Sequence, residues 1–257
     1  MPKFGYLVVE GPHDVEFAYR LLRPFGLSRV RLENDLDQFF KPLVPRTFPH
    51  DGDLQKRMPV PLFLQSSTHA IALHSAIGDS RLVATVEENA NLLALQSLTG
   101  VGIMLDTDNE IPATDRYSAI RTAMDAKGFR LPANAGEIAS GSPKLGAFVL
   151  PDNATTGNLE DLLLECAANA YPELLESARK HVDVAVDQAG RLARDGEDLS
   201  KTPYRNKAIV GAIASVLRPG KAVQTSIQDN QWIKGERLQL DRIKAVQVFL
   251  ANLFELF

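Results

Sequence analysis

Two carboxylates, Asp106 and Asp108, follow the apolar segment 101–105 and are separated only by Thr107. A short apolar segment of this kind is typical of a buried strand in a parallel sheet. Because side chains alternate along a strand, both carboxylates are expected on the same side. Such a pair suits Mg²⁺, which keeps several water ligands and accepts phosphate oxygens. The alternative is that the two acids only mark the point where the strand meets water.

A third acid, Glu10, holds a similar position after the apolar segment 4–9. Apolar residues at three-to-four-residue spacing follow a short turn and predict a helix that ends near residue 22. Glu10 is therefore expected at the carboxyl end of a strand, where open α/β sheets hold their ligands. If the two strands are parallel neighbours, Glu10, Asp106 and Asp108 meet at one edge of the sheet.

The motif Val-Glu-Gly-x-x-Asp-x-x-Phe around Glu10, followed by Ile-Met-Leu-Asp-x-Asp ending at Asp108, resembles the TOPRIM domain. This domain occurs in topoisomerases, primases, OLD (overcoming lysogenization defect) nucleases and ribonuclease M5. The resemblance implies an α/β fold with an open, mainly parallel sheet flanked by helices. It implies that Glu10 is a general acid or base and that Asp106 and Asp108 bind Mg²⁺ or Mn²⁺. The interval between the motifs is longer than in the compact TOPRIM pattern, which implies an insertion.

A third apolar segment, 147–150, is expected to be a strand, and Asp152 follows it directly. The sequence Gly-Asn-Leu-Glu that ends at Glu160 then opens a strongly apolar helix. It resembles a turn that recurs in a small group of uncharacterised prokaryotic TOPRIM-like proteins, which implies Glu160, and less directly Asp152, as a metal ligand or a supporting acid. Acids in the first turn of a helix are also favoured by capping and by the helix dipole.

Three more residues are accessory candidates at this site. Asp14 is the second acid of the N-terminal motif, and His13 lies in the turn beside Glu10, where it could contact a bound phosphate. Lys207 could reach a phosphate as a point charge on a long stem. Structural polarity is the alternative for His13, and a solvated helix position is the alternative for Lys207. The scattered histidines have no spacing suited to zinc.

The expected organisation is a TOPRIM-like α/β domain over residues 1–157 with a helical C-terminal extension, 158–257, packed on it. Five prolines between 42 and 61 predict a long surface loop, which is the expected insertion. Further expected elements are strands at 30–32 and 62–65, helices at 69–76, 81–98, 115–126 and 205–217, and a final helix from Asp241. Trp232 is expected to pack in the core or at an interface.

Composition indicates an ordinary globular protein of 257 residues, with a net charge of −4 and 45% hydrophobic residues. No apolar segment approaches a membrane span, and the N-terminus enters a strand instead of a signal peptide, so we expect a cytoplasmic protein without a membrane partner. The only cysteine, Cys166, is expected to be a buried apolar side chain. The apolar run that ends at Phe257 could join copies of the chain in a homo-oligomer.

Together these features predict Mg²⁺-dependent or Mn²⁺-dependent phosphodiester chemistry on nucleic acid, DNA or RNA, of the kind that TOPRIM nucleases perform. The net negative charge does not attract nucleic acid, although segment 201–244 holds nine basic residues against three acidic ones. One alternative is a non-catalytic TOPRIM-like module that binds nucleic acid or a partner such as a separate ATPase, since this sequence has no Gly-x-x-x-x-Gly-Lys loop. A second alternative is a phosphatase for small phosphoesters. The sequence departs from the dehalogenase-like phosphatase motif in two ways. Asp106 lies in the middle of the chain instead of near its start, and Glu110 stands at the fifth position of the motif, where that family has Thr.

Overall fold

The computed structural model describes residues 2–47, 60–107, 111–188, 199 and 201–257. Its described strands form one sheet of seven, in the order β2-β3-β4-β1-β5-β7-β6. The central strands β4, β1, β5 and β7 are parallel, and β2, β3 and β6 pair antiparallel at the two sides. The strands are β1 (Lys3–Val9), β2 (Ser28–Arg29), β3 (Leu62–Gln65), β4 (His69–Ser75), β5 (Leu98–Asp106), β6 (Ile138–Ala139) and β7 (Lys144–Leu150).

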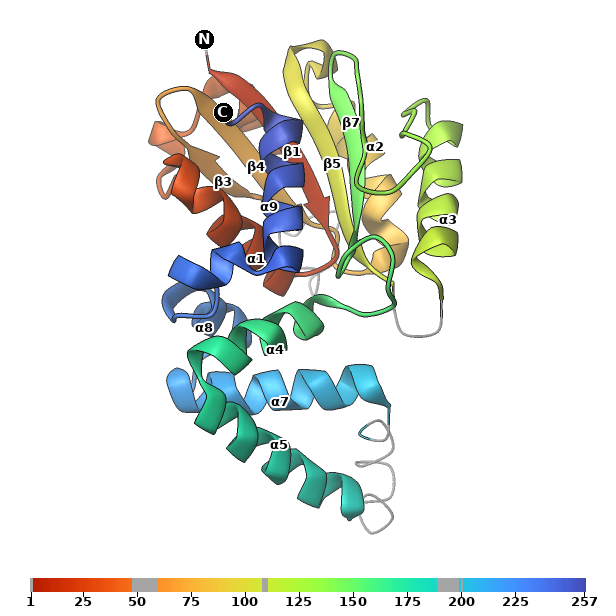
Figure 1. Ribbon diagram of the computed structural model, residues 1–257. Helices are drawn as coiled ribbons and strands as arrows, with labels where there is room; N and C mark the ends of the chain where they lie inside the picture. The colour runs from red at the N-terminus through yellow and green to blue at the C-terminus, as the bar shows by residue number, and fades with distance from the viewer. Residues whose placement is uncertain (1, 48–59, 108–110, 189–198, 200) are drawn as a thin grey trace.

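Helices cover both faces of the sheet and its carboxyl end. In Figure 1, α1 and α9 lie on one face, α2 and α3 lie on the other, and α4, α5 and α7 lie below the sheet. The α-helices are α1 (Pro12–Leu22), α2 (Leu82–Ala90), α3 (Ala113–Ala126), α4 (Leu159–Ala170), α5 (Pro172–Asp187), α7 (Thr202–Leu217), α8 (Val223–Asp229) and α9 (Asp241–Phe254). The architecture confirms the predicted α/β fold with a partly parallel sheet and C-terminal helices.

The alternation of side chains along β1 divides the apolar interior into two cores. Leu7 and Val9 belong to the core shared with α1 and α9, whereas Tyr6 and Val8 belong to the core on the opposite face. Strand β1 is therefore apolar on both sides, as expected for a central parallel strand. Glu10, the first polar residue after β1, lies beyond the end of the strand and outside both cores.

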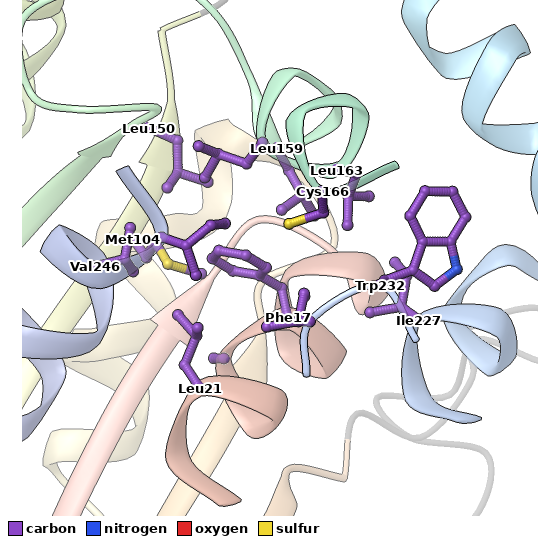
Figure 2. Close-up of a cluster of buried hydrophobic side chains, with 14 of the residues drawn as sticks. Phe17, Leu21, Met104, Leu150, Leu159, Leu163, Cys166, Ile227, Trp232 and Val246 are labelled. Atoms are coloured by element: carbon purple, nitrogen blue, oxygen red, sulfur yellow. The ribbon is translucent and has the colours of Figure 1, made fainter. Parts of the chain in front are cut away.

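The first core extends from the sheet to the helices at its carboxyl end. Figure 2 shows Phe17 of α1 between side chains of β5 and α4, with Trp232 at the far side of the cluster. Trp232 is fully buried, and its Nε1 donates a hydrogen bond to Ser226 Oγ at 2.9 Å, which confirms the packing role. Cys166 is also buried, and burial raises the pKa of its thiol to about 12, as expected for a packing residue and not for a nucleophile.

The C-terminal helix α9 packs closely against β1 and β5 where these strands have glycine. A Cβ atom on Gly5 would lie 2.6 Å from the ring of Phe254, and one on Gly102 would lie 2.6 Å from Leu253 Cδ2. At Gly100 a Cβ atom would collide with the backbone oxygen of Leu253. These glycines let the last helix of the chain complete the layer that α1 begins.

Three expected elements differ from those observed. Residues 69–76, expected to be helical, form β4, and the expected strand at 30–32 is replaced by β2 at Ser28–Arg29. Segment 69–75 contains Ala70, Ala72 and Leu73, which favour helices, but β4 lies between β1 and β3 with both of its faces buried, so tertiary context overrides propensity. Helix α2 ends at Ala90 instead of 98.

The strand predicted at 62–65 is confirmed as β3. Most of the proline-rich segment 42–61 lies outside the described residues. Among the helices that the structure describes, none is long and apolar enough to cross a membrane.

The close contact between α9 and the sheet predicts opposite effects for two Gly→Ala substitutions. Gly100→Ala should lower the free energy of unfolding by about 3 kcal/mol, because the backbone of α9 must move to admit the methyl group. Gly211→Ala, in α7, meets no atom within 4 Å and should raise it by about 0.5–1 kcal/mol through helix propensity. Urea denaturation measures both. Equal stability of Gly100→Ala and wild type would contradict the described packing.

Candidate functional site

A pocket of about 380 Å³ lies at the carboxyl end of the central strands, between the sheet and the helices below it. Four carboxylates line it, from the ends of two strands and the starts of two helices: Glu10, Asp14, Asp106 and Glu160. Three of them, Asp14, Asp106 and Glu160, are more than nine-tenths buried. Acidic side chains are rarely buried to this degree unless a partner or a ligand offsets their charge.

Glu10 and Asp106 lie together because β1 and β5 are parallel neighbours in register. Val9 is paired with Met104, so both strands end at the same edge of the sheet. Glu10 Oε1 accepts a hydrogen bond from the backbone N–H of Asp106 at 3.0 Å. The two acids that the sequence motifs single out are thereby held side by side, although they are separated by 96 positions.

The carboxylate of Asp106 is directed at the start of α4. Its Oδ1 accepts a hydrogen bond from the backbone N–H of Leu159 at 3.0 Å, one of the donors that the first turn of a helix leaves unpaired. Burial raises the pKa of Asp106 well above its usual value, and the negative charges of Asp14, Glu10 and Glu160 raise it further. Ionising the carboxyl groups of this pocket therefore costs free energy.

Asp14 shares this environment. Burial, followed by the charges of Glu10 and Glu160, raises its pKa to about 7, and the hydrogen bond from the Gly11 N–H to its Oδ2, 2.9 Å long, only partly offsets this. The Asp14 carboxyl therefore holds its proton to a higher pH than an ordinary aspartate does. A cation in the pocket would favour the ionised form.

Glu160 is not the residue that caps α4. The capping box is formed by Asn158 and Asp161, with the Asn158 N–H donating to Asp161 Oδ2 at 2.8 Å. Glu160 instead lies in the pocket, where its Oε1 is 3.8 Å from Nδ1 of His13 and its buried Oε2 has no hydrogen-bond partner within the described residues. The capping explanation therefore accounts for Asp161 and leaves the burial of Glu160 unexplained. An unpaired buried carboxylate oxygen is a feature that a bound ligand would satisfy.

Thr107 fastens the end of β5 to the start of α4. Its hydroxyl donates to the Gly157 carbonyl at 2.7 Å and accepts from the Gly157 N–H at 2.5 Å. Gly157 has φ +157°, and a Cβ atom there would lie 2.6 Å from Asp161 Oδ2. The residue between the paired aspartates thus fixes the helix start that carries Glu160.

Arg116 is a part of the site that the sequence did not indicate. Its Nη2 lies 3.3 Å from Glu10 Oε1 and 3.3 Å from Asp79 Oδ2, and its Nε donates to the backbone oxygen of Asp106 at 3.1 Å. Its side chain is only 13% exposed, so it acts as an internal clamp on the strand ends. One feature of the sequence could have indicated Arg116: it lies in the first turn of the helix after β5, and such turns lie at the same edge of the sheet as the strand ends.

The remaining sequence candidates divide into two groups. His13 and Lys207 line the pocket with the acids. Asp152 does not line it, because its carboxylate pairs with Arg242 Nε at 3.0 Å and accepts a hydrogen bond from the Thr155 N–H at 2.7 Å. Asp108 lies outside the described residues. Over the part of the chain that is described, no group of three or more His, Cys, Asp or Glu side chains is placed so that it could hold a metal ion.

Residues 5–255 match the model of the family described as "Protein of unknown function (DUF3226)", and the chain belongs to this family. Its fold is similar to the crystal structure of the hypothetical protein PH0156 from Pyrococcus horikoshii OT3, with a TM-score of 0.53 and 17% sequence identity. That similarity covers 98% of this chain and 95% of the other and concerns the fold alone. Comparison with curated proteins gives no match.

The raised pKa of Asp14 predicts how stability depends on pH without divalent cations. Its folded-state pKa is about 7, against a usual 3.8, so between these values the folded protein binds more protons than the unfolded chain. This group therefore makes the free energy of unfolding fall as the pH rises from about 4 to about 7. Asp14→Asn should make the measured fall shallower without abolishing it, because the raised pKa of Asp106 acts in the same direction. Urea denaturation in EDTA across this range measures the slope.

Asp125→Asn, an exposed position on α3, is the matched control and should keep the wild-type pH dependence. A pH profile of Asp14→Asn parallel to that of wild type would show that Asp14 is not the buried, charge-crowded group described.

Proposed function

We propose that this member of the DUF3226 family is a cytoplasmic, TOPRIM-like enzyme that hydrolyses phosphodiester bonds of nucleic acid with the help of Mg²⁺ or Mn²⁺. The observation that carries the proposal is the 3.0 Å hydrogen bond between Glu10 and the Asp106 N–H, inside a pocket that also contains Asp14 and Glu160. It joins the two motifs on which the TOPRIM resemblance rests. The single sheet edge they share is the place where open α/β folds hold ligands.

The donor type of the pocket suits a hard divalent cation, and the described acids would need Asp108, which lies outside the described residues, to complete a set of three ligands. Carboxylate oxygens are the preferred ligands of such a cation, and the unpaired Oε2 of Glu160 and the raised pKa of Asp106 both indicate negative charge without sufficient compensation. We assign Asp106, Asp108 and Glu160 as the residues that would hold the metal. When bound, the cation would polarise a phosphate and stabilise the charge that develops on it.

The other pocket residues would act on the substrate directly. Glu10 is held by the Asp106 N–H and by Arg116, so its carboxylate is oriented for proton transfer at the phosphate. Lys207 would supply a positive charge to a phosphate oxygen, and His13, in the same pocket, would supply a second polar contact. Arg116 is a positioning residue in this scheme, because its guanidinium is occupied by Glu10, Asp79 and the Asp106 carbonyl.

Two alternatives predict different behaviour from the same pocket. A non-catalytic module that binds nucleic acid or a separate ATPase would bind an oligonucleotide without a response to metal. The net charge of −4 does not attract nucleic acid and therefore favours the version of this module that binds a separate ATPase. A phosphatase for small phosphoesters would hydrolyse a chromogenic phosphoester, which a diesterase with a nucleic-acid substrate would leave intact.

Metal binding should stabilise the protein through this pocket. Mn²⁺ should raise the melting temperature of wild type, since a cation relieves the repulsion among the buried carboxylates. Asp106→Asn should be more stable than wild type in EDTA, because it removes one buried charge and keeps the oxygen that accepts from Leu159, but it should lose most of the Mn²⁺ response. Differential scanning calorimetry with and without Mn²⁺ measures both quantities. An unchanged Mn²⁺ response in Asp106→Asn would place the metal elsewhere.

Catalysis should depend on the same acids. Wild type should cleave single-stranded or double-stranded DNA or RNA in Mg²⁺ or Mn²⁺, and Asp106→Ala and Glu10→Gln should each lower kcat/KM by about 100-fold or more. Asp125→Asn should keep full activity. Gel assays with end-labelled strands provide the measurement, and undiminished cleavage by both pocket variants would reject the assignment.

A further inference from the structure

An exposed tyrosine stands on the helix that borders the pocket. Tyr204 lies in the first turn of α7, and 45% of its surface is exposed. Its hydroxyl takes part in no hydrogen bond among the described residues, unlike the buried Tyr6, whose hydroxyl pairs with His74. The ring is thus presented to solvent without a polar anchor. Large aromatic side chains in this position commonly serve recognition.

Two ammonium groups lie over this ring, and a base that stacks on it would displace one of them toward the neighbouring phosphate. Lys201 Nζ lies 5.6 Å from the ring centroid of Tyr204, and Lys207 Nζ lies 5.9 Å from it. Both distances are within the range of cation–π attraction, so the lysines and the ring form one cluster. The neighbouring Arg205 is directed at Asp183 of α5 and not at this ring. Lys201, Tyr204 and Lys207 are hereafter called the α7 strip.

The α7 strip is continuous with the acidic pocket. Lys207 lines the pocket, as does Val210 one turn further along α7. Tyr204 precedes Lys207 by three positions, so the two side chains are neighbours on one helix face. A chain of phosphates whose reacting group lies among the carboxylates would therefore pass the Lys207 ammonium and reach the Tyr204 ring.

We propose, on the basis of the function proposed above, that the α7 strip selects single-stranded nucleic acid by stacking one base on Tyr204 while Lys201 and Lys207 contact the flanking phosphates. An aromatic ring beside cationic groups is the arrangement by which proteins hold unpaired bases along a charged track. Any base offers a π face, so the strip is expected to be tolerant of sequence. In a duplex the bases are already stacked on one another, so no base face is available to stack on the Tyr204 ring.

The strip also explains how an acidic protein could hold a polyanion. The net charge of −4 gives no general attraction, and the pocket carboxylates repel phosphate. Local attraction from two ammonium groups, together with stacking that does not depend on charge, would offset this repulsion at one place only. Binding should therefore depend on salt more weakly than in proteins with extended basic surfaces.

Fluorescence anisotropy of a labelled oligo(dT) strand, in Ca²⁺ to avoid cleavage, tests the proposal. Wild type should bind this strand more tightly than a hairpin duplex or an abasic strand of equal length. Tyr204→Ala should weaken oligo(dT) binding by about tenfold and leave binding of the abasic strand unchanged, because only the stacking contribution is lost. Tyr204→Phe should retain wild-type affinity, since it keeps the ring.

Val216→Ala, at an exposed apolar position of the same helix, is the matched control and should bind like wild type. Equal affinity of Tyr204→Ala and wild type for oligo(dT), an equal loss on the abasic strand, or the same loss in Val216→Ala would each overturn the stacking role. Stacking-dependent binding by a protein that never cleaves would reject the nuclease and keep the strip. Cleavage with no contribution from Tyr204 would do the reverse.

Discussion

Electrostatic repulsion among buried carboxylates is the constraint around which this structure is built. Glu10, Asp14, Asp106 and Glu160 come from four different elements and share one pocket, where burial and mutual repulsion raise the pKa of Asp106 and of Asp14. Left alone, such groups would separate or remain in water. They stay together because the backbone supplies donors to them: the N–H groups of Asp106, Leu159 and Gly11 each bind one of these carboxylates.

The rest of the fold holds those donors in place. The parallel register of β1 and β5 brings Glu10 beside Asp106, and the Thr107–Gly157 hydrogen bonds fix where α4 starts relative to β5. On the other side, α9 presses against glycines of β1 and β5, so the two strands cannot shift without disturbing the C-terminal helix. Stability that is distant from the pocket is thus used to maintain an arrangement that is locally unfavourable, a pattern common at functional sites.

The sequence predicted the features that follow from short-range pattern. The apolar segments ending at Glu10 and Asp106, and the helix after Gly157, are observed as β1, β5 and α4. It missed β4, because Ala70, Ala72 and Leu73 favour a helix and only the neighbouring strands make the segment extended. It also missed Arg116, since a single basic residue in a helix has no distinguishing pattern until the fold brings it to Glu10. Asp152 was expected near the acids, but its local turn and Arg242 occupy it.

Anomalous diffraction from crystals soaked in Mn²⁺ would test the central claim most directly. We expect a single strong manganese peak in the pocket, bonded to Asp106 and to at least one of Asp108 and Glu160, with water completing its coordination. A pocket without a peak at saturating Mn²⁺, or a peak bound only by acids elsewhere on the surface, would contradict it.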